Sequence, residues 1–358
     1  MTDYTNIPWK DLETKGFVHV PGFLSQAELA VCRDDFAQQP VKANNHNNPL
    51  SDASSRVACL QDSVAEVIAL VNAKTDIRID CGFGGMYFAT KRGVVFPWHQ
   101  DHESYFAFQN HYDYLNFFIP VVKPAKDKSN LSIVPFDVLE RESPKIFRRL
   151  VRSGATTVYD LGGRLMLFQV DSGTAHLMPS SFDRFACTPE LAAGDLLLLR
   201  GDMLHRTQDG ETERVALSIR AGNSKTIVRR ARLADGGFSK ATMMANNFGP
   251  YEILFRAFDA SGKDELPVSE LMRYMSEVGD QPAEVVERPR RYLLKQKVRS
   301  GVLLSSVGKG VNELITRFAR FPYHRRLAQS EISRRSPSAG ASSEHVGGGD
   351  KSSLSGRL

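Results

Sequence analysis

Two histidines and an aspartate carry the ligand chemistry of a metal site in this sequence. His99 and Asp101 lie one residue apart in FPWHQDHESYF, after an apolar run. If this stretch is a β-strand, both side chains point to one face, because side chains alternate with a period of two. His205, which follows the apolar run DLLLLRG, supplies a third ligand. We therefore expect His99, Asp101 and His205 to hold one metal ion and to leave other coordination positions open.

Two imidazoles and one carboxylate are the ligand set of non-haem iron(II) oxygenases. A second pair with the same spacing, His111 and Asp113, competes with the first on spacing alone. We rank His99 and Asp101 ahead, because they follow an apolar strand, whereas His111 lies where a strand only begins.

An arginine beside such a metal could bind the far carboxylate of a short dicarboxylate through two hydrogen bonds. Asp209 and Gly210 are a strong signal for a two-residue hairpin turn. With that turn, His205 would face Arg214 at a Cβ separation of ~5 Å. Arg220 points to the same side but would be displaced by ~20 Å along the strand. The sequence therefore favours Arg214 over Arg220.

The order of these motifs resembles a known enzyme family. GFVHVPGFLSQAEL, then WHQD, then the distal histidine and an arginine-led final strand look like the phytanoyl-CoA dioxygenase-type branch of the 2-oxoglutarate oxygenases, over roughly residues 10–225. The resemblance implies a double-stranded β-helix (jelly-roll) core with Fe(II) on His99, Asp101 and His205. It also implies 2-oxoglutarate as co-substrate, bound to the iron and to Arg214, with O2 as the oxidant.

Further residues lie near the site by position. Tyr87 and Asn116 resemble co-substrate-binding positions of the family. His102 and Tyr105, shortly after the metal pair, are as consistent with substrate contact as with an ordinary rim position. The implied reaction is hydroxylation of an unactivated C–H bond of a small molecule, with release of succinate and CO2. A cupin-like metal isomerase or epimerase, and a non-catalytic binding protein on the same barrel, remain alternatives.

The elements that would position these residues are mainly β-strands. Short apolar runs, cut by Gly, Pro and Asp, recur between residues 80 and 225, as is typical of a sandwich or barrel. Apolar residues at helical spacing predict helices near 26–39 and 61–75, the first capped by Ser25, and another helical segment within 135–154. We expect a mainly β fold with helical additions and a jelly-roll core between N-terminal and C-terminal helices.

The expected domain organisation follows from the same pattern. Residues 1–228 would form the jelly-roll domain with its N-terminal helices, and 229–330 a helical extension packed on this core. Residues 331–358 are rich in Ser and Gly without an apolar period, which predicts a disordered tail.

The amino-acid composition argues against several classes of protein. The chain has 358 residues, of which 42% are hydrophobic and 24% charged, as in soluble globular proteins. Its 4 scattered cysteines form no CxxC pair, which argues against a zinc ribbon or a disulfide framework. We see neither a signal-peptide pattern nor an apolar run of the ~18 residues that a membrane span needs, and expect a cytoplasmic protein.

The net charge of +5 is concentrated in the C-terminal third of the chain. This basic run lacks the aromatic interleaving of a nucleic-acid surface, so we expect no nucleic-acid partner. It favours an anionic small-molecule substrate. The sequence does not indicate an oligomeric state.

Overall fold

The computed structural model of the chain describes residues 3–38, 57–90, 96–151, 155–160, 165–170, 174–178, 181–210, 212–234 and 248–279, all within one compact unit, Met1–Asn312. The polar segment 44–55, the helices predicted beyond residue 279 and the predicted tail lie outside the described residues. No helix in the described ranges is long and apolar enough to cross a membrane.

The larger of two antiparallel sheets supplies one wall of the core. It has five strands in the order β1-β8-β3-β10-β2, and every pair is antiparallel. In this order the strands span Phe17–Val20, Leu196–Arg200, Tyr114–Val122, Arg214–Gly222 and Cys81–Thr90.

The second wall is made of shorter strands. β4 (Leu131–Ile133) pairs with β9 (His205–Thr207), and β5 (Thr156–Asp160), β6 (Leu165–Gln169) and β7 (Thr174–Met178) form a separate ladder. His99 joins the two ladders, because it bridges to His205 on one side and to Thr157 on the other.

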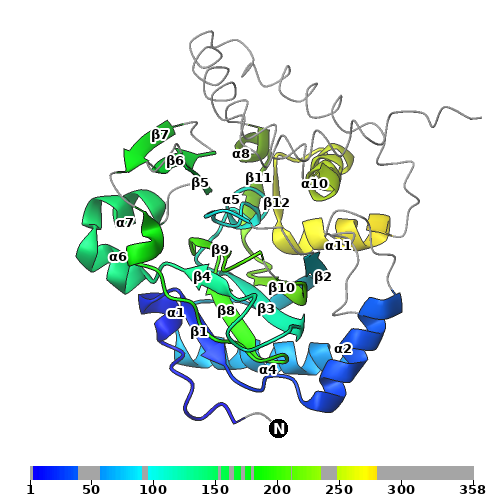
Figure 1. The fold of residues 1–358 in the computed structure, drawn as a ribbon. Helices are drawn as coiled ribbons and strands as arrows, with labels where there is room; N and C mark the ends of the chain where they lie inside the picture. Colours follow the sequence, from blue (N-terminus) through cyan, green and yellow to red (C-terminus); the bar gives the residue numbers. More distant parts are fainter. Residues whose placement is uncertain are drawn as a thin grey trace, which may run out of the picture. The chain divides into compact units, whose positions relative to one another are not determined.

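The chain passes repeatedly from one wall to the other, as in the step from β8 through β9 to β10 (Figure 1). Alternation of strands between two antiparallel sheets is the jelly-roll arrangement. The predicted fold class, a jelly-roll core with helical additions, is confirmed.

Helices cover the outer face of the larger sheet. Figure 1 shows α1 (Asp11–Thr14), α2 (Gln26–Gln38) and α4 (Ala58–Lys74) along this side. Val215, Leu217 and Ile219 of β10 pack into the same apolar cluster as these helices. Ala216 packs instead against side chains of β4 and β8, between the sheets. The period of two therefore directs the polar face of β10 into the barrel.

The start of α2 follows the predicted capping pattern. The Ser25 backbone N–H donates to Glu28 Oε2 at 2.7 Å, and the Glu28 N–H donates to Ser25 Oγ at 3.3 Å. This reciprocal pair satisfies two N–H groups that the helix itself cannot.

The remaining described elements lie around the barrel or after it. They are α5 (Glu103–Phe106), α6 (Phe136–Glu142), α7 (Pro144–Leu150), η1 (Phe182–Arg184), β11 (Ile227–Arg229), α8 (Arg230–Ala234), α10 (Phe248–Ser261), β12 (Glu265–Pro267) and α11 (Val268–Gly279). Within the expected helical extension, Val268–Gly279 forms α11, whereas the small β11-β12 ladder carried no sequence signal that we recognised.

Candidate metal centre

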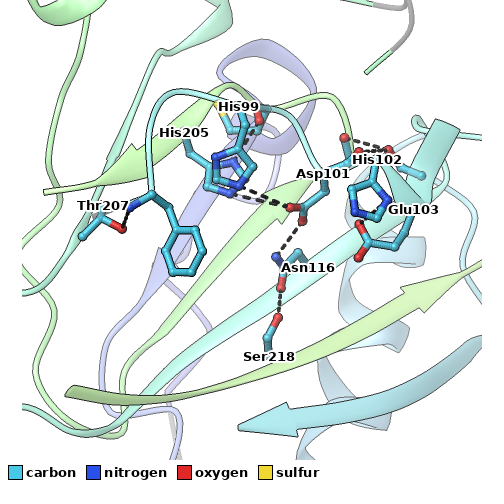
Figure 2. Close-up of polar contacts among 12 residues, drawn as sticks. His99, Asp101, His102, Glu103, Asn116, His205, Thr207 and Ser218 are labelled. Atoms are coloured by element: carbon cyan, nitrogen blue, oxygen red, sulfur yellow. Dashed lines mark hydrogen bonds and ion pairs between the residues drawn. The ribbon is translucent and has the colours of Figure 1, made fainter. Parts of the chain in front are cut away.

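The structure brings together the three residues selected by spacing. His99 and His205 are adjacent across two backbone hydrogen bonds, of 2.9 and 3.0 Å, so their rings point to the same side. Asp101 Oδ1 lies 3.7 Å from His205 Nε2 and 4.0 Å from His99 Nε2 (Figure 2). Within the described ranges this is the one cluster of potential metal ligands, with ligand atoms within 4.8 Å of one another.

Both imidazoles are held in the form that binds a metal. His99 Nδ1 lies 2.7 Å from the Pro97 carbonyl oxygen, and His205 Nδ1 lies 3.0 Å from that of Met203. A carbonyl only accepts hydrogen bonds, so each Nδ1 carries a proton, and in the neutral imidazole the lone pair is then on Nε2. These two Nε2 atoms face Asp101. The residues present therefore fit a metal ion bound by two neutral imidazoles and a carboxylate.

The charge states agree with this assignment. Burial, followed by the neighbouring His205, lowers the pKa of His99 from 6.5 to about 4. Burial by itself would raise the pKa of Asp101, but Arg220 and the two imidazoles outweigh it, so that pKa lies below its ordinary value. A neutral His99 and an ionised Asp101 are the forms that bind a metal.

Gln100, between the two ligands, faces away from the site. Its Nε2 donates to the Leu150 carbonyl at 2.9 Å and to the Asp202 carbonyl at 2.7 Å, and its Oε1 accepts from Thr156 N–H at 3.0 Å. One buried amide thus ties together the metal pair, β5, the end of α7 and the turn before His205. Sequence reasoning did not single out this residue, although strand alternation would have pointed it away from the metal face.

We expect Gln100→Met to lower the free energy of unfolding by about 3 kcal/mol, because it leaves buried backbone groups without partners while nearly conserving volume. Urea denaturation followed by circular dichroism measures the change. Gln26→Met, at an exposed position of α2, is the matched control and should change stability by less than about 0.5 kcal/mol. Equal stability of the two variants would show that the amide does not hold these segments.

The turn that leads into His205 contains a buried ion pair. Arg200 Nε and Nη2 donate to the two carboxylate oxygens of Asp202, both at 2.7 Å, and the guanidinium lies 4.5 Å from the centre of the Phe136 ring. A bidentate pair of this kind has a fixed geometry. It holds the segment from β8 to β9 and so helps to place His205.

The alternative pair, His111 and Asp113, does not form a metal site in the described structure. His111 stacks on Tyr105 with ring centres 4.8 Å apart, and its Nε2 lies 4.0 Å from Asp202 Oδ2. Asp113 accepts hydrogen bonds from Arg78 N–H and from the Asn110 amide. Among the described residues, the cluster that could hold a metal contains the first pair and not the second.

The predicted hairpin between His205 and Arg214 is wrong. β9 pairs with β4, whereas β10 pairs with β2 and β3 in the other sheet. The Asp209 carboxylate instead accepts from Ser129 N–H at 2.8 Å and from Thr212 Oγ1 at 3.2 Å. Both edges of β10 are already paired, so no edge is left for β9, and the chain crosses between sheets after His205.

Arg214 nevertheless reaches the interior near β9. Its Nη2 donates to Thr207 Oγ1 at 3.1 Å, and Thr207 follows His205 by two residues on the same buried face of the strand. Arg214 is only 7% exposed, and burial lowers its pKa. No carboxylate among the described residues forms a salt bridge with it.

Arg220, which the expected displacement disfavoured, lies beside the Asp101 carboxylate. Its Nη2 is 3.7 Å from Asp101 Oδ2. The expectation failed because it measured the distance from a hairpin partner that does not exist. In the observed register Arg220 is opposite Asn116 on β3.

Of Asn116 and Tyr87, the two residues expected to bind co-substrate besides Arg214, one lies at the site. Asn116 Nδ2 donates to Asp101 Oδ2 at 3.0 Å (Figure 2). Tyr87 lies in the apolar cluster on the outer face of the sheet, and its hydroxyl donates to the Cys32 carbonyl at 3.1 Å. The expectation for Tyr87 is therefore not supported, because its register opposite Leu217 directs it toward the helices.

The two candidate substrate residues differ in exposure. His102 lies beside Asp101 in Figure 2, with its Nδ1 3.7 Å from Glu103 Oε2. Tyr105 is 1% exposed and packs on His111. The position of His102 fits the rim of the site, whereas Tyr105 is on the buried face of α5.

Comparisons with known proteins find similar folds at low identity. No family model and no curated protein sequence matches the chain. The non-heme alpha ketoglutarate dependent epimerase SnoN from nogalamycin biosynthesis is 15% identical, with 62% of this chain and 84% of that chain covered and a TM-score of 0.41. EvdO2 from Micromonospora carbonacea var. aurantiaca is 12% identical, with coverages of 62% and 91% and a TM-score of 0.41.

HygX from Streptomyces hygroscopicus, with nickel and 2-oxoglutarate bound, is 15% identical, with coverages of 60% and 84% and a TM-score of 0.36. These values place the chain in no family. The conclusion on function therefore rests on the side chains of its own site.

Proposed function

We propose that this chain is a non-haem Fe(II)- and 2-oxoglutarate-dependent oxygenase. The observation that carries the proposal is the convergence of His99, Asp101 and His205 on one point, with both Nδ1 atoms on backbone carbonyls and both Nε2 atoms directed at a carboxylate oxygen. Iron(II) is the metal that this ligand set commonly binds in oxygenases, and its open positions take the reactants. His99 is 31% exposed, which leaves the site accessible from outside.

Bound iron(II) would supply the redox chemistry that activates dioxygen while the co-substrate is decarboxylated. The chain's own contribution is to keep the two imidazoles neutral and oriented and to hold the carboxylate between them. The backbone carbonyls of Pro97 and Met203 fix the ring orientations, and Gln100 fixes the segment that carries the first pair.

Arg214 is the residue that we assign to the far carboxylate of 2-oxoglutarate. A buried guanidinium that forms no salt bridge with a described residue is costly unless an anion binds to it. Its contact with Thr207 places it about 7 Å along β9 from His205, since a strand rises about 3.3 Å per residue. A five-carbon dicarboxylate has the length to reach from the metal to this guanidinium, which can grip it with two parallel hydrogen bonds.

The reaction that we propose is hydroxylation of a small molecule, with release of succinate and CO2. His102, at the rim beside Asp101, is the described residue best placed to contact that substrate.

The test is anaerobic titration of the protein with Fe(II) and then 2-oxoglutarate, following the metal-to-ligand charge-transfer absorption. We expect stoichiometric iron binding, a new visible band on adding 2-oxoglutarate, and succinate formation once air is admitted. A metal isomerase would bind iron but release no succinate. A non-catalytic binding protein would not bind iron stoichiometrically.

A further inference from the structure

The two oxygens of the Asp101 carboxylate lie in different surroundings. Oδ1 faces the two imidazoles, at 3.7 Å from His205 Nε2 and 4.0 Å from His99 Nε2. Oδ2 faces the larger sheet, where it accepts a hydrogen bond of 3.0 Å from Asn116 Nδ2 and lies 3.7 Å from Arg220 Nη2. One oxygen is directed to the metal position and the other is held by protein donors.

The side chains that hold Oδ2 are themselves fixed. Asn116 Oδ1 accepts from Ser218 Oγ at 2.7 Å and from Arg220 Nη1 at 3.1 Å, and Arg220 Nη1 also contacts Ser218 Oγ (Figure 2 shows the path from Asp101 through Asn116 to Ser218). All three side chains are buried on the paired strands β3 and β10.

The chemistry of the donors sets the direction of the amide. A guanidinium only donates hydrogen bonds, so the Asn116 atom that faces Arg220 must be the carbonyl oxygen. The NH2 group is then the atom presented to Asp101. Arg220 thus acts twice, by orienting Asn116 and by placing a permanent positive charge near Oδ2.

We propose that Asn116 and Arg220 are positioning residues that restrict Asp101 to binding the metal through Oδ1 alone. A carboxylate can coordinate a metal through one oxygen or through both. Here Oδ2 is already occupied by a hydrogen bond, and the nearby cation repels a metal ion that shifts toward it. Single-oxygen binding keeps one more coordination position open on the metal.

This inference depends on the metal site of the proposed function, and not on the identity of the co-substrate. The proposed role of Asn116 and Arg220 differs from simple compensation of the charge of a buried aspartate. If Arg220 only neutralised the charge of Asp101, removing the neutral amide of Asn116 would leave metal coordination unchanged.

The experiment counts the water molecules on a probe metal. Mn(II) is loaded into the protein without co-substrate, and Mn(II) affinity and water-proton relaxation are measured for wild type, Asn116→Ala, Arg220→Met and Arg220→Lys. A six-coordinate ion with three protein ligands carries about three waters, and chelation by both Asp101 oxygens removes one, so the relaxation enhancement should fall by about a third in Asn116→Ala and Arg220→Met.

The lysine variant should restore part of the enhancement, since it keeps the charge but loses the planar donor pair. Asn130→Ala is the matched control, because Asn130 is also a buried asparagine, but its amide bonds the Lys126 carbonyl oxygen and the Leu191 N–H instead of a metal ligand. It should keep the wild-type value. Circular dichroism melting checks that each variant folds, and Asn116→Ala decides the question if Arg220→Met does not fold.

Wild-type enhancement in Asn116→Ala would overturn the inference, and so would a fall confined to the arginine variants. In either case Mn(II) binding by the wild type would leave the proposed function standing. Failure of the wild-type protein to bind Mn(II) would contradict both the positioning role of Asn116 and Arg220 and the proposed function.

Discussion

Replacing His205 with alanine is expected to lower the affinity for Fe(II) by more than about 100-fold and to abolish turnover, because loss of a direct ligand exceeds the effect of losing a supporting contact. The same result is expected for His99→Ala and Asp101→Ala. Each change leaves two ligands at a site whose three ligand atoms lie within 4.8 Å of one another. Anaerobic titration with Fe(II), with the bound metal quantified after gel filtration, measures the loss.

His111→Ala is the control for this experiment. It removes a histidine with the same sequence spacing to an aspartate, but its ring stacks on Tyr105 outside the cluster. Metal binding should be unchanged in this variant. Loss of iron from His111→Ala together with retention in His99→Ala would assign the metal to the other pair.

Replacing Arg214 with alanine is expected to weaken 2-oxoglutarate binding by at least about 100-fold while iron affinity stays close to that of the wild type. Two charge-assisted hydrogen bonds contribute ~1.5–3 kcal/mol each, and ~1.4 kcal/mol corresponds to a factor of ten. Lysine should rescue binding only in part, because it offers a point charge in place of two parallel donors. The measurement is the anaerobic charge-transfer titration of the iron-loaded protein.

Pyruvate is the control ligand that tests whether Arg214 acts on the far carboxylate of 2-oxoglutarate. It has the same 2-oxo acid group as 2-oxoglutarate but lacks the second carboxylate, so wild type and Arg214→Ala should bind it equally weakly. A large loss of pyruvate affinity in the variant would show that Arg214 acts on the metal site itself. Unchanged 2-oxoglutarate affinity in Arg214→Ala would show that Arg214 does not bind the co-substrate.

Arg214 is expected to lower the stability of the ligand-free protein. It is buried without a salt bridge among the described residues, so only the more distant charge of Asp209 and the hydrogen bond to Thr207 offset its desolvation there. Apolar replacement of such a charge is often neutral or stabilising. We therefore expect Arg214→Met to keep or raise the melting temperature, measured without co-substrate, as is common for residues retained for binding.

The metal ligands could be predicted from the sequence because their signal is local. The one-residue spacing of His99 and Asp101 sets a common face, and the apolar run before His205 predicts the strand that leads to it. The capping of α2 by Ser25 and Glu28, and the alternation along β10 that directs Val215 outward and Arg214 inward, are local in the same sense.

Only the tertiary structure decided which side chains surround those ligands. The period of two specifies the face of a strand but not its neighbours, and a turn signal at Asp209 did not reveal that both edges of β10 were already paired. Arg220 and Asn116 meet Asp101 because β3 and β10 pair in one register, and Tyr87 points to Cys32 because β2 lies on the other side of β10. Strand pairing depends on contacts between residues far apart in the sequence, so the ligands could be identified from the sequence but their supporting residues could not.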